Sequence, residues 1–132
     1  PGTPAAFASL MEIREHLLQK GAHVAAPCPG QDACKKPGGD WCHFTCRIAR
    51  SRLHRQLKGG EAPFEDEKFS YIALSREKSP GPDARVLRHP LVRGGHVVLE
   101  VCTARGIENM TLSKSDGERY RKARRAKAGD AF

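Results

Sequence analysis

Cysteine is the residue type in this chain whose number and spacing could do chemistry. Four of the five cysteines lie in one short segment, PCPGQDACKKPGGDWCHFTC (27–46), and the fifth lies far downstream: Cys28, Cys34, Cys42, Cys46 and Cys102. The count is odd and no signal peptide is recognisable, which argues against a disulfide framework. Clustered thiols in a reducing compartment are typically metal ligands. We therefore expect a metal or iron–sulfur site organised around residues 27–46.

The cysteine spacings fit an iron–sulfur cluster better than a structural zinc site. Structural zinc sites use short knuckles with two to four residues between ligands, and here only Cys42 and Cys46 have that spacing. Iron–sulfur clusters accept wider spacings and a ligand from far along the chain. A zinc site can still be drawn from Cys28, Cys34, Cys42 and His43. Taken alone, Cys46 on a predicted helix and Cys102 on a predicted strand are each explained as packing residues.

The charge balance favours a polyanionic partner. The 132 residues include 23 Lys and Arg against 15 Asp and Glu, a formal charge of +8, with a pI of about 9.6. Ribosomal or other nucleic acid fits such a balance best. No apolar run approaches the roughly 20 residues of a membrane helix, so we expect a soluble chain with no membrane partner. The length allows one domain with a modest core.

The segment that precedes the first cysteine has the pattern of an α/β unit. Thr3 and Pro4 suit the start of a helix that ends at Gly21, with Phe7, Leu10, Met11, Arg14, Leu17 and Leu18 at helical spacing. Residues 22–26 predict a short strand that ends at Pro27. Sites in α/β units collect at the carboxyl ends of strands. Cys28 stands at such an end, followed by a Pro/Gly-rich loop over residues 29–39.

A second, basic helix is predicted from Asp40 to Lys58, with apolar positions at Trp41, Phe44, Ile48, Leu53 and Leu57. Its polar positions hold cations without an acid, which favours phosphate binding over a merely solvated face. The predicted contacts on this helix are Arg47, Arg50, Arg52, Arg55 and Lys58. Residues 61–68 predict an acidic turn.

The second half predicts strands and a terminal helix. Strands are expected at 69–75, 84–88, 96–103 and 107–112, the last two joined as a hairpin. Ser115 and Glu118 have the spacing of a capping box, and the helix behind them, GERYRKARRAKAG, has a thin apolar stripe. We expect it to be ordered mainly by a partner. Its predicted phosphate contacts are Arg121, Arg124 and Arg125.

With these residues assembled, the chain resembles the methyltransferase-like small-ribosomal-subunit assembly family of bacteria and mitochondria. The matching stretches cover nearly the whole chain: PGTPAAF, GAHVAAPCPG, DWCHF, RSRLHRQLKGGE, EDEKFSYIALSR, ARVLRHP and SKSDGERYRKARRAKAGD. The resemblance implies a class I methyltransferase-like (Rossmann-like) α/β fold with a mixed sheet. Residues 1–113 would be the C-terminal half of that domain with its cysteine-rich loop, and residues 114–132 a basic tail.

The resemblance also implies a function and a ligand set. Family members are taken to bind small-subunit rRNA during assembly and to hold a [4Fe-4S] cluster. Carried over by position, the ligands are Cys28, Cys34, Cys42 and Cys102, with Cys46 left out. The expected partner is the assembling small ribosomal subunit, bound by a monomer. The expected compartment is the bacterial cytoplasm or the mitochondrial matrix.

One family feature has no counterpart here. Class I methyltransferases place a glycine-rich loop after the first strand to approach S-adenosylmethionine, whereas the glycines of this chain fall in turns and helix ends. We therefore expect the C-terminal part of a longer protein, non-catalytic by itself, with S-adenosylmethionine bound only in the longer protein. The alternatives are a fragment of an S-adenosylmethionine-dependent RNA methyltransferase and a zinc-stabilised nucleic-acid-binding module.

Overall fold

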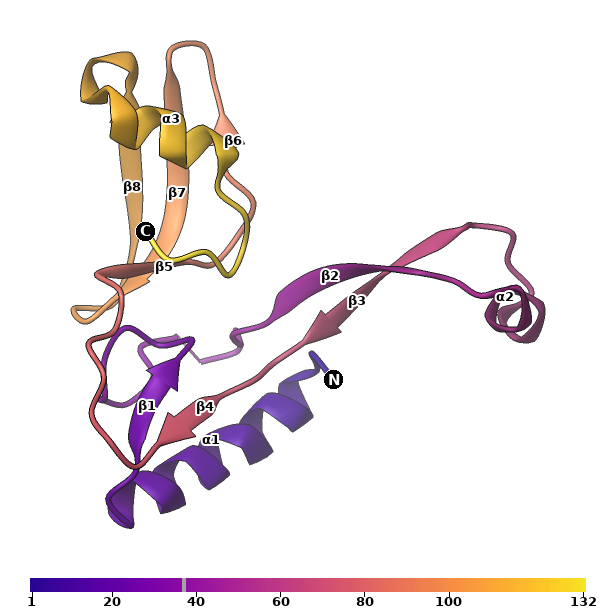
Figure 1. Ribbon diagram of the computed structural model, residues 1–132, viewed down its shortest axis with the longest axis horizontal. Helices are drawn as coiled ribbons and strands as arrows, with labels where there is room; N and C mark the ends of the chain where they lie inside the picture. The colour runs from indigo at the N-terminus through magenta and orange to yellow at the C-terminus, as the bar shows by residue number, and fades with distance from the viewer. Residues whose placement is uncertain (37) are drawn as a thin grey trace.

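The protein, described here by a computed structural model over residues 1–36 and 38–132, combines helices with small antiparallel sheets (Figure 1). The elements in order are α1 (Pro4–Gln19), β1 (His23–Ala26), β2 (Phe44–Ala49), α2 (Arg52–Lys58), β3 (Phe64–Phe69), β4 (Ala73–Ser75), β5 (Ala84–Val86), β6 (Leu91–Val92), β7 (His96–Thr103), β8 (Ile107–Ser113), the 3-10 turn η1 (Lys114–Asp116) and α3 (Glu118–Arg125). The α/β class is confirmed. The strands named here pair antiparallel, so the expected mixed sheet is not formed among them.

The main core lies in the C-terminal sheet, where β7 is the central strand. β7 pairs with β5, β6 and β8, and its alternating pattern buries Val97, Leu99 and Val101 on one face. An alternation of period two is what a half-buried strand requires. The predicted hairpin of residues 96–112 is therefore confirmed as β7–β8.

Helix α3 covers the buried face of this sheet (Figure 1). Tyr120, Ala123 and Ala126 belong to the main core cluster. We expected few core contacts to hold this helix, and that expectation is wrong. The small alanine side chains let the helix lie close to the sheet, so a narrow apolar face is enough to pack it there. The capping box also differs, because Ser113 and Asp116 form it, with the Asp116 carboxylate accepting from the Ser113 amide at 2.7 Å.

A two-stranded arm, β2–β3 with α2 at its tip, extends away from both other parts (Figure 1). Six pairs run from Phe44↔Phe69 to Ala49↔Phe64. The predicted helix from Asp40 is therefore wrong before residue 52, and the predicted acidic turn is strand β3. The apolar residues have helical spacing, but this segment pairs as a strand with residues that are distant in sequence. Such pairing is not visible in the local sequence. Only α2 remains helical, between the Ser51 cap and Gly59 in the left-handed region at φ 60.

The N-terminal part packs α1 beside the β1–β4 pair (Figure 1). Helix α1 and strand β1 were predicted, and the Thr3 hydroxyl accepts the Ala6 amide at 3.3 Å as an N-cap. Gly2 lies against β3, where its amide donates to the Lys68 carbonyl at 2.8 Å. A Cβ on Gly2 would lie 2.6 Å from Lys68 backbone carbon, so only glycine fits there. This approach fixes the start of α1 against the root of the arm.

Candidate metal centre and nucleic-acid interface

The four predicted cysteine ligands line one pocket: Cys28, Cys34, Cys42 and Cys102. Three come from the loop between β1 and β2, and Cys102 comes from β7, where it pairs with Arg85 and Ile107 in the neighbouring strands. The rest of the lining is mainly apolar, with Met11, Phe44 and Leu87 among it. The fold thus brings together thiols that are far apart in sequence.

Cys46 lies elsewhere. It is exposed on β2 and is not among the residues that line the thiol pocket. Our expectation that Cys46 packs on the inner face of a helix is wrong, because this segment is a strand. Its omission from the ligand set stays a prediction, and its position makes it a matched control for the other four.

Three polar side chains hold the first turn of the cysteine loop, and Arg14 among them is buried. Arg14, only 2% exposed on α1, donates from Nη2 to the Gln31 carbonyl at 2.9 Å and to the Asp32 carbonyl at 2.6 Å. The side-chain amide of Gln31 in turn accepts from the Val24 backbone N–H at 2.7 Å and donates to the Val24 carbonyl at 3.0 Å, on β1. Arg85 donates to the Pro27 carbonyl at 2.8 Å. The residues around Cys28 and Cys34 are therefore held by α1, β1 and β5 together.

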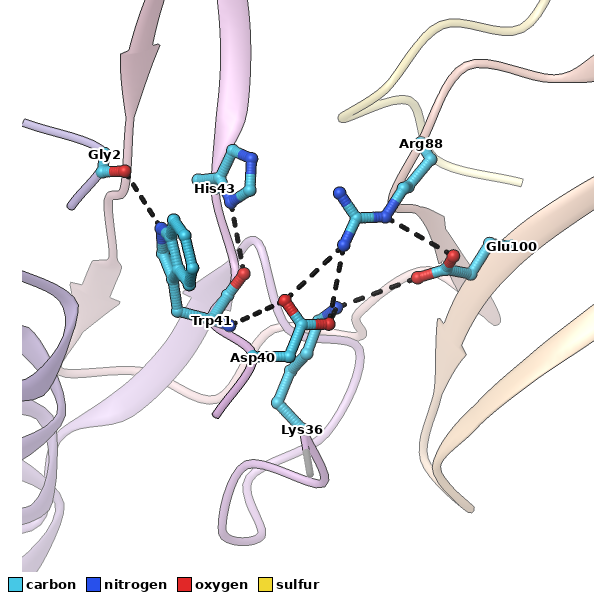
Figure 2. A network of polar contacts seen from close by, with 7 residues as sticks. All are labelled: Gly2, Lys36, Asp40, Trp41, His43, Arg88 and Glu100. Carbon is cyan, nitrogen blue, oxygen red and sulfur yellow. Dashed lines mark hydrogen bonds and ion pairs between the residues drawn. The ribbon is translucent and has the colours of Figure 1, made fainter. Parts of the chain in front are cut away.

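An ion network anchors the second half of the loop (Figure 2). Lys36 pairs with Asp40 and, at 3.7 Å, with Glu100 of β7. Arg88 reaches the same two carboxylates, each at 3.4 Å. Because Glu100 precedes Cys102 by two residues on the same strand, this network ties the loop to the strand that carries the fourth thiol.

The pKa values of three pocket thiols are raised. Burial is the main cause for Cys42, whose pKa rises to about 12, and proximity to Cys28, Cys34 and Cys102 adds to it. Burial, with the neighbouring Cys28 and Cys34, also raises the pKa of Cys102. Burial raises the pKa of Cys28, while the Arg14 cation opposes it. Four thiolates in an apolar pocket repel one another, so a cationic centre is needed to hold all four deprotonated.

The candidate donor set of this pocket consists of the four thiols. In the described part of the chain no group of three or more His, Cys, Asp or Glu side chains could hold a metal ion, although four thiols share the pocket. A four-iron cluster is larger than one ion and takes cysteines that lie further apart. Arg14 Nε is buried and has no hydrogen-bond partner among the described residues, and the Arg14 cation acts to lower the pKa of Cys28. A buried unpaired donor beside thiols suits an anionic group.

Carboxylates of β3 face most of the predicted basic residues of the arm. Glu65 binds Arg50 at 2.8 Å, His54 at 3.0 Å and Lys58 at 3.1 Å. The Arg50 hydrogen bond is the main reason why the pKa of Glu65 falls to about 2. Arg47 binds Asp66 through two bonds of 2.7 and 3.0 Å. The expectation of cations without an acid is therefore corrected: the compensating acids come from the paired strand.

Among the predicted RNA contacts, the cations that stay available lie at the arm tip and on α3. Arg52 and Arg55 border a shallow depression at the end of α2, and neither forms an ion pair with another described residue. Leu53 and Leu57 on the same helix are 64% and 78% exposed. On α3, Arg121 makes one ion pair of 3.7 Å with Glu118, and Arg124 lies over the Tyr120 ring. Arg125 donates from Nε to the Arg121 carbonyl.

Sequence reasoning missed Arg14, Lys36 and Arg88 as parts of this site. Arg14 had a detectable signal, because an arginine in the middle of an apolar helix face needs a buried partner. Lys36 and Arg88 had none, since their carboxylate partners become neighbours only in the folded chain.

Among the helices that the structure describes, none is long and apolar enough to cross a membrane.

The matches to known proteins extend over nearly the whole chain. Residues 1–132 match the family described as mitochondrial small ribosomal subunit Rsm22. The chain belongs to the Rsm22 family. Two relatives from Schizosaccharomyces pombe, the mitochondrial Rsm22-cox11 tandem proteins 1 and 2, are each 24% identical over 179 residues. The alignment covers 99% of this chain and 23% of each relative, so the chain spans about a quarter of the Rsm22 relatives it matches.

Proposed function

We propose that this chain is an rRNA-binding part of a factor that assembles the mitochondrial small ribosomal subunit, stabilised by a [4Fe-4S] cluster on Cys28, Cys34, Cys42 and Cys102. Membership of the Rsm22 family supports the subunit and the organelle. The observation that carries the cluster is the convergence of four thiols from two distant segments on one mainly apolar pocket. The mitochondrial matrix is the proposed compartment.

The cluster is proposed to act as a structural cross-link. When bound it would be held by three cysteines of the loop and by Cys102 of β7, and so would link the two segments covalently. Arg14 would hold the loop around Cys28 and donate its free Nε toward the anionic centre. Lys36 and Arg85, which also line the pocket, would offset negative charge from the same side. The apolar lining would exclude water from the sulfur atoms.

RNA binding is proposed to use cations that the fold leaves available. Arg52 and Arg55 at the tip of an extended arm can reach a phosphate backbone without breaking an internal ion pair. Arg121, Arg124 and Arg125 offer a second basic surface on α3. Arg47, Arg50 and Lys58, bound to Asp66 and Glu65, would position the arm more than they contact RNA. Contacts of this kind fix position and do not read sequence.

The longer protein is proposed to complete a class I methyltransferase-like fold, in which this chain supplies the C-terminal part. Catalysis and S-adenosylmethionine binding would belong to the preceding residues. The alternative is a zinc-stabilised nucleic-acid-binding module, which metal analysis distinguishes from the cluster.

Anaerobic purification followed by iron, acid-labile sulfide and zinc analysis tests the cluster. We expect about four iron and four sulfide per chain and broad visible absorption. Cys42→Ser should abolish both, whereas Cys46→Ser, the exposed cysteine outside the pocket, should change neither. Zinc in place of iron, or equal loss in both variants, contradicts the proposal.

A salt titration tests RNA binding. Arg52→Gln with Arg55→Gln should weaken binding to small-subunit rRNA and lower the salt slope by about 1.4, or about 0.7 per lost phosphate contact. An unchanged slope would clear the arm tip of this role.

A further inference from the structure

A second basic groove lies between the root of the arm and the C-terminal turn. Its lining includes three permanent cations, two imidazoles and one carboxylate: Arg47, Arg88, Lys127, His43, His89 and Asp66. Four separate segments supply them, namely β2 with the residue before it, β3, the residues after β5, and the residues after α3. Apart from Arg47, none was among the predicted nucleic-acid contacts.

Backbone contacts hold the walls of this groove in place. The Gly129 amide donates to the Val86 carbonyl at 2.8 Å, and the Val86 amide donates to the Asp130 carbonyl at 3.0 Å. Gly129, at φ 96, packs against the Phe44 ring at the root of β2. The C-terminal turn is thus fixed against both β5 and the arm, so the groove is a property of the folded chain.

The cations of the groove differ in how strongly they are already bound. Asp66 is engaged by Arg47 at 2.7 and 3.0 Å, so this pair adds no net charge. Arg88 is half exposed, and its contacts to Asp40 and Glu100 are long, at 3.4 Å, against 2.7–2.9 Å for a strong charge-assisted bond. Lys127 forms no side-chain ion pair or hydrogen bond with another described residue. Arg88 and Lys127 therefore retain donors for an anion.

His43 adds a flat ring to the lining of the groove, and Figure 2 shows its contact with the Trp41 carbonyl. Its Nδ1 lies 3.2 Å from the Trp41 carbonyl, and a carbonyl only accepts, so Nδ1 carries the hydrogen and Nε2 stays free for a ligand. The ring also stacks near the Trp41 indole, with centroids 5.0 Å apart and planes at 30°. Trp41 is itself anchored to the Gly2 carbonyl at 2.9 Å.

We propose that this groove binds a single strand of RNA, with Arg88 and Lys127 on the phosphates and the imidazoles of His43 and His89 against unpaired bases. Cations next to flat rings are the usual combination for single-stranded nucleic acid. An acidic protein segment would use the cations and gain little from the rings. The inference rests on the proposed RNA-binding function and adds a site separate from the arm tip and α3.

The groove is also connected to the thiol pocket. Arg88 is oriented by Asp40 and Glu100, which also bind Lys36 in the cysteine loop. Asp40 and Glu100 thus link Arg88 in the groove to Lys36 in the cysteine loop.

The test compares two charge-matched pairs of substitutions in the same protein. Binding of a fluorescent single-stranded RNA of twelve nucleotides is measured by anisotropy over a salt series for Arg88→Gln/Lys127→Gln and for Arg52→Gln/Arg55→Gln. The groove pair should lower the salt slope by about 1.4 and weaken binding roughly 25-fold at 0.1 M salt, since each lost contact contributes about 0.7. Lys127→Gln alone, which breaks no internal contact, should weaken binding about fivefold.

Crosslinking gives a second readout that a change in stability would not produce. RNA carrying a photoreactive uridine should crosslink to peptides that contain His43 or His89, and at a sub-saturating protein concentration the crosslink yield should fall with Lys127→Gln. If the groove variants bind as the unmodified protein does while the arm variant loses affinity, the groove is overturned and the proposed function stands. If no RNA binds at all, both fail. Equal or tighter binding of a poly-glutamate peptide overturns RNA as the ligand class.

Discussion

Replacing Cys102 with serine should uncouple the C-terminal sheet from the cysteine loop. A cluster on Cys42 and Cys102 closes a span of about 60 residues. By analogy with a covalent cross-link, closing such a span removes about 4 kcal/mol of conformational entropy, expressed as free energy, from the unfolded chain. Loss of the cluster should therefore lower the free energy of unfolding by about 4 kcal/mol and the Tm by roughly 15 °C.

The assay is urea unfolding under anaerobic conditions, before and after removal of iron by a chelator. The unmodified protein and Cys46→Ser should both lose about 4 kcal/mol on chelation. Cys102→Ser should start at the lower value and show no further loss. Equal unfolding midpoints before and after chelation would refute the proposed cross-link, and so would a Cys46→Ser variant that behaves like Cys102→Ser.

Three further predictions concern the residues around the site. Tyr120→Ala should cost about 3 kcal/mol by urea unfolding, because Tyr120 is 8% exposed in the core; no change would mean that α3 is ordered only by a partner. Arg14→Met should reduce the iron content and make the reduction potential more negative in anaerobic voltammetry, because a buried positive charge beside the thiols is removed; an unchanged potential in the fraction that retains iron would show that Arg14 only holds the loop. The pKa of Glu65 falls from 4.5 in the unfolded chain to about 2 when folded, so its contribution is complete above pH 4.5 and lost as the pH falls toward 2. The stability difference between the unmodified protein and Glu65→Gln, measured by urea unfolding, should therefore shrink as the pH falls from 4.5 to 2; an unchanged difference over that range would show that the Glu65 ion pairs do not stabilise the arm.

The regular elements were predictable where local pattern and tertiary environment agree. Helix α1 had a cap, a proline at its start and an apolar face, and the alternation of β7 matched its burial. The arm was predicted incorrectly because Phe44, Ile48 and Leu53 also have helical spacing. Its strands form only because residues 64–69 return to pair with them, and that pairing is a long-range contact.

The sequence alone determined the chemistry available to this protein: a set of thiols, a strong excess of cations, and the family resemblance that selected Cys102 over Cys46. Only the tertiary structure decided which of these groups meet. It placed Cys28, Cys34, Cys42 and Cys102 around one pocket and left Cys46 on an exposed strand. It also paired Arg50 and Lys58 with Glu65 and left Lys127 available. The physical reason is that residue type fixes what a side chain can bind, whereas burial and pairing between distant segments fix what it does bind.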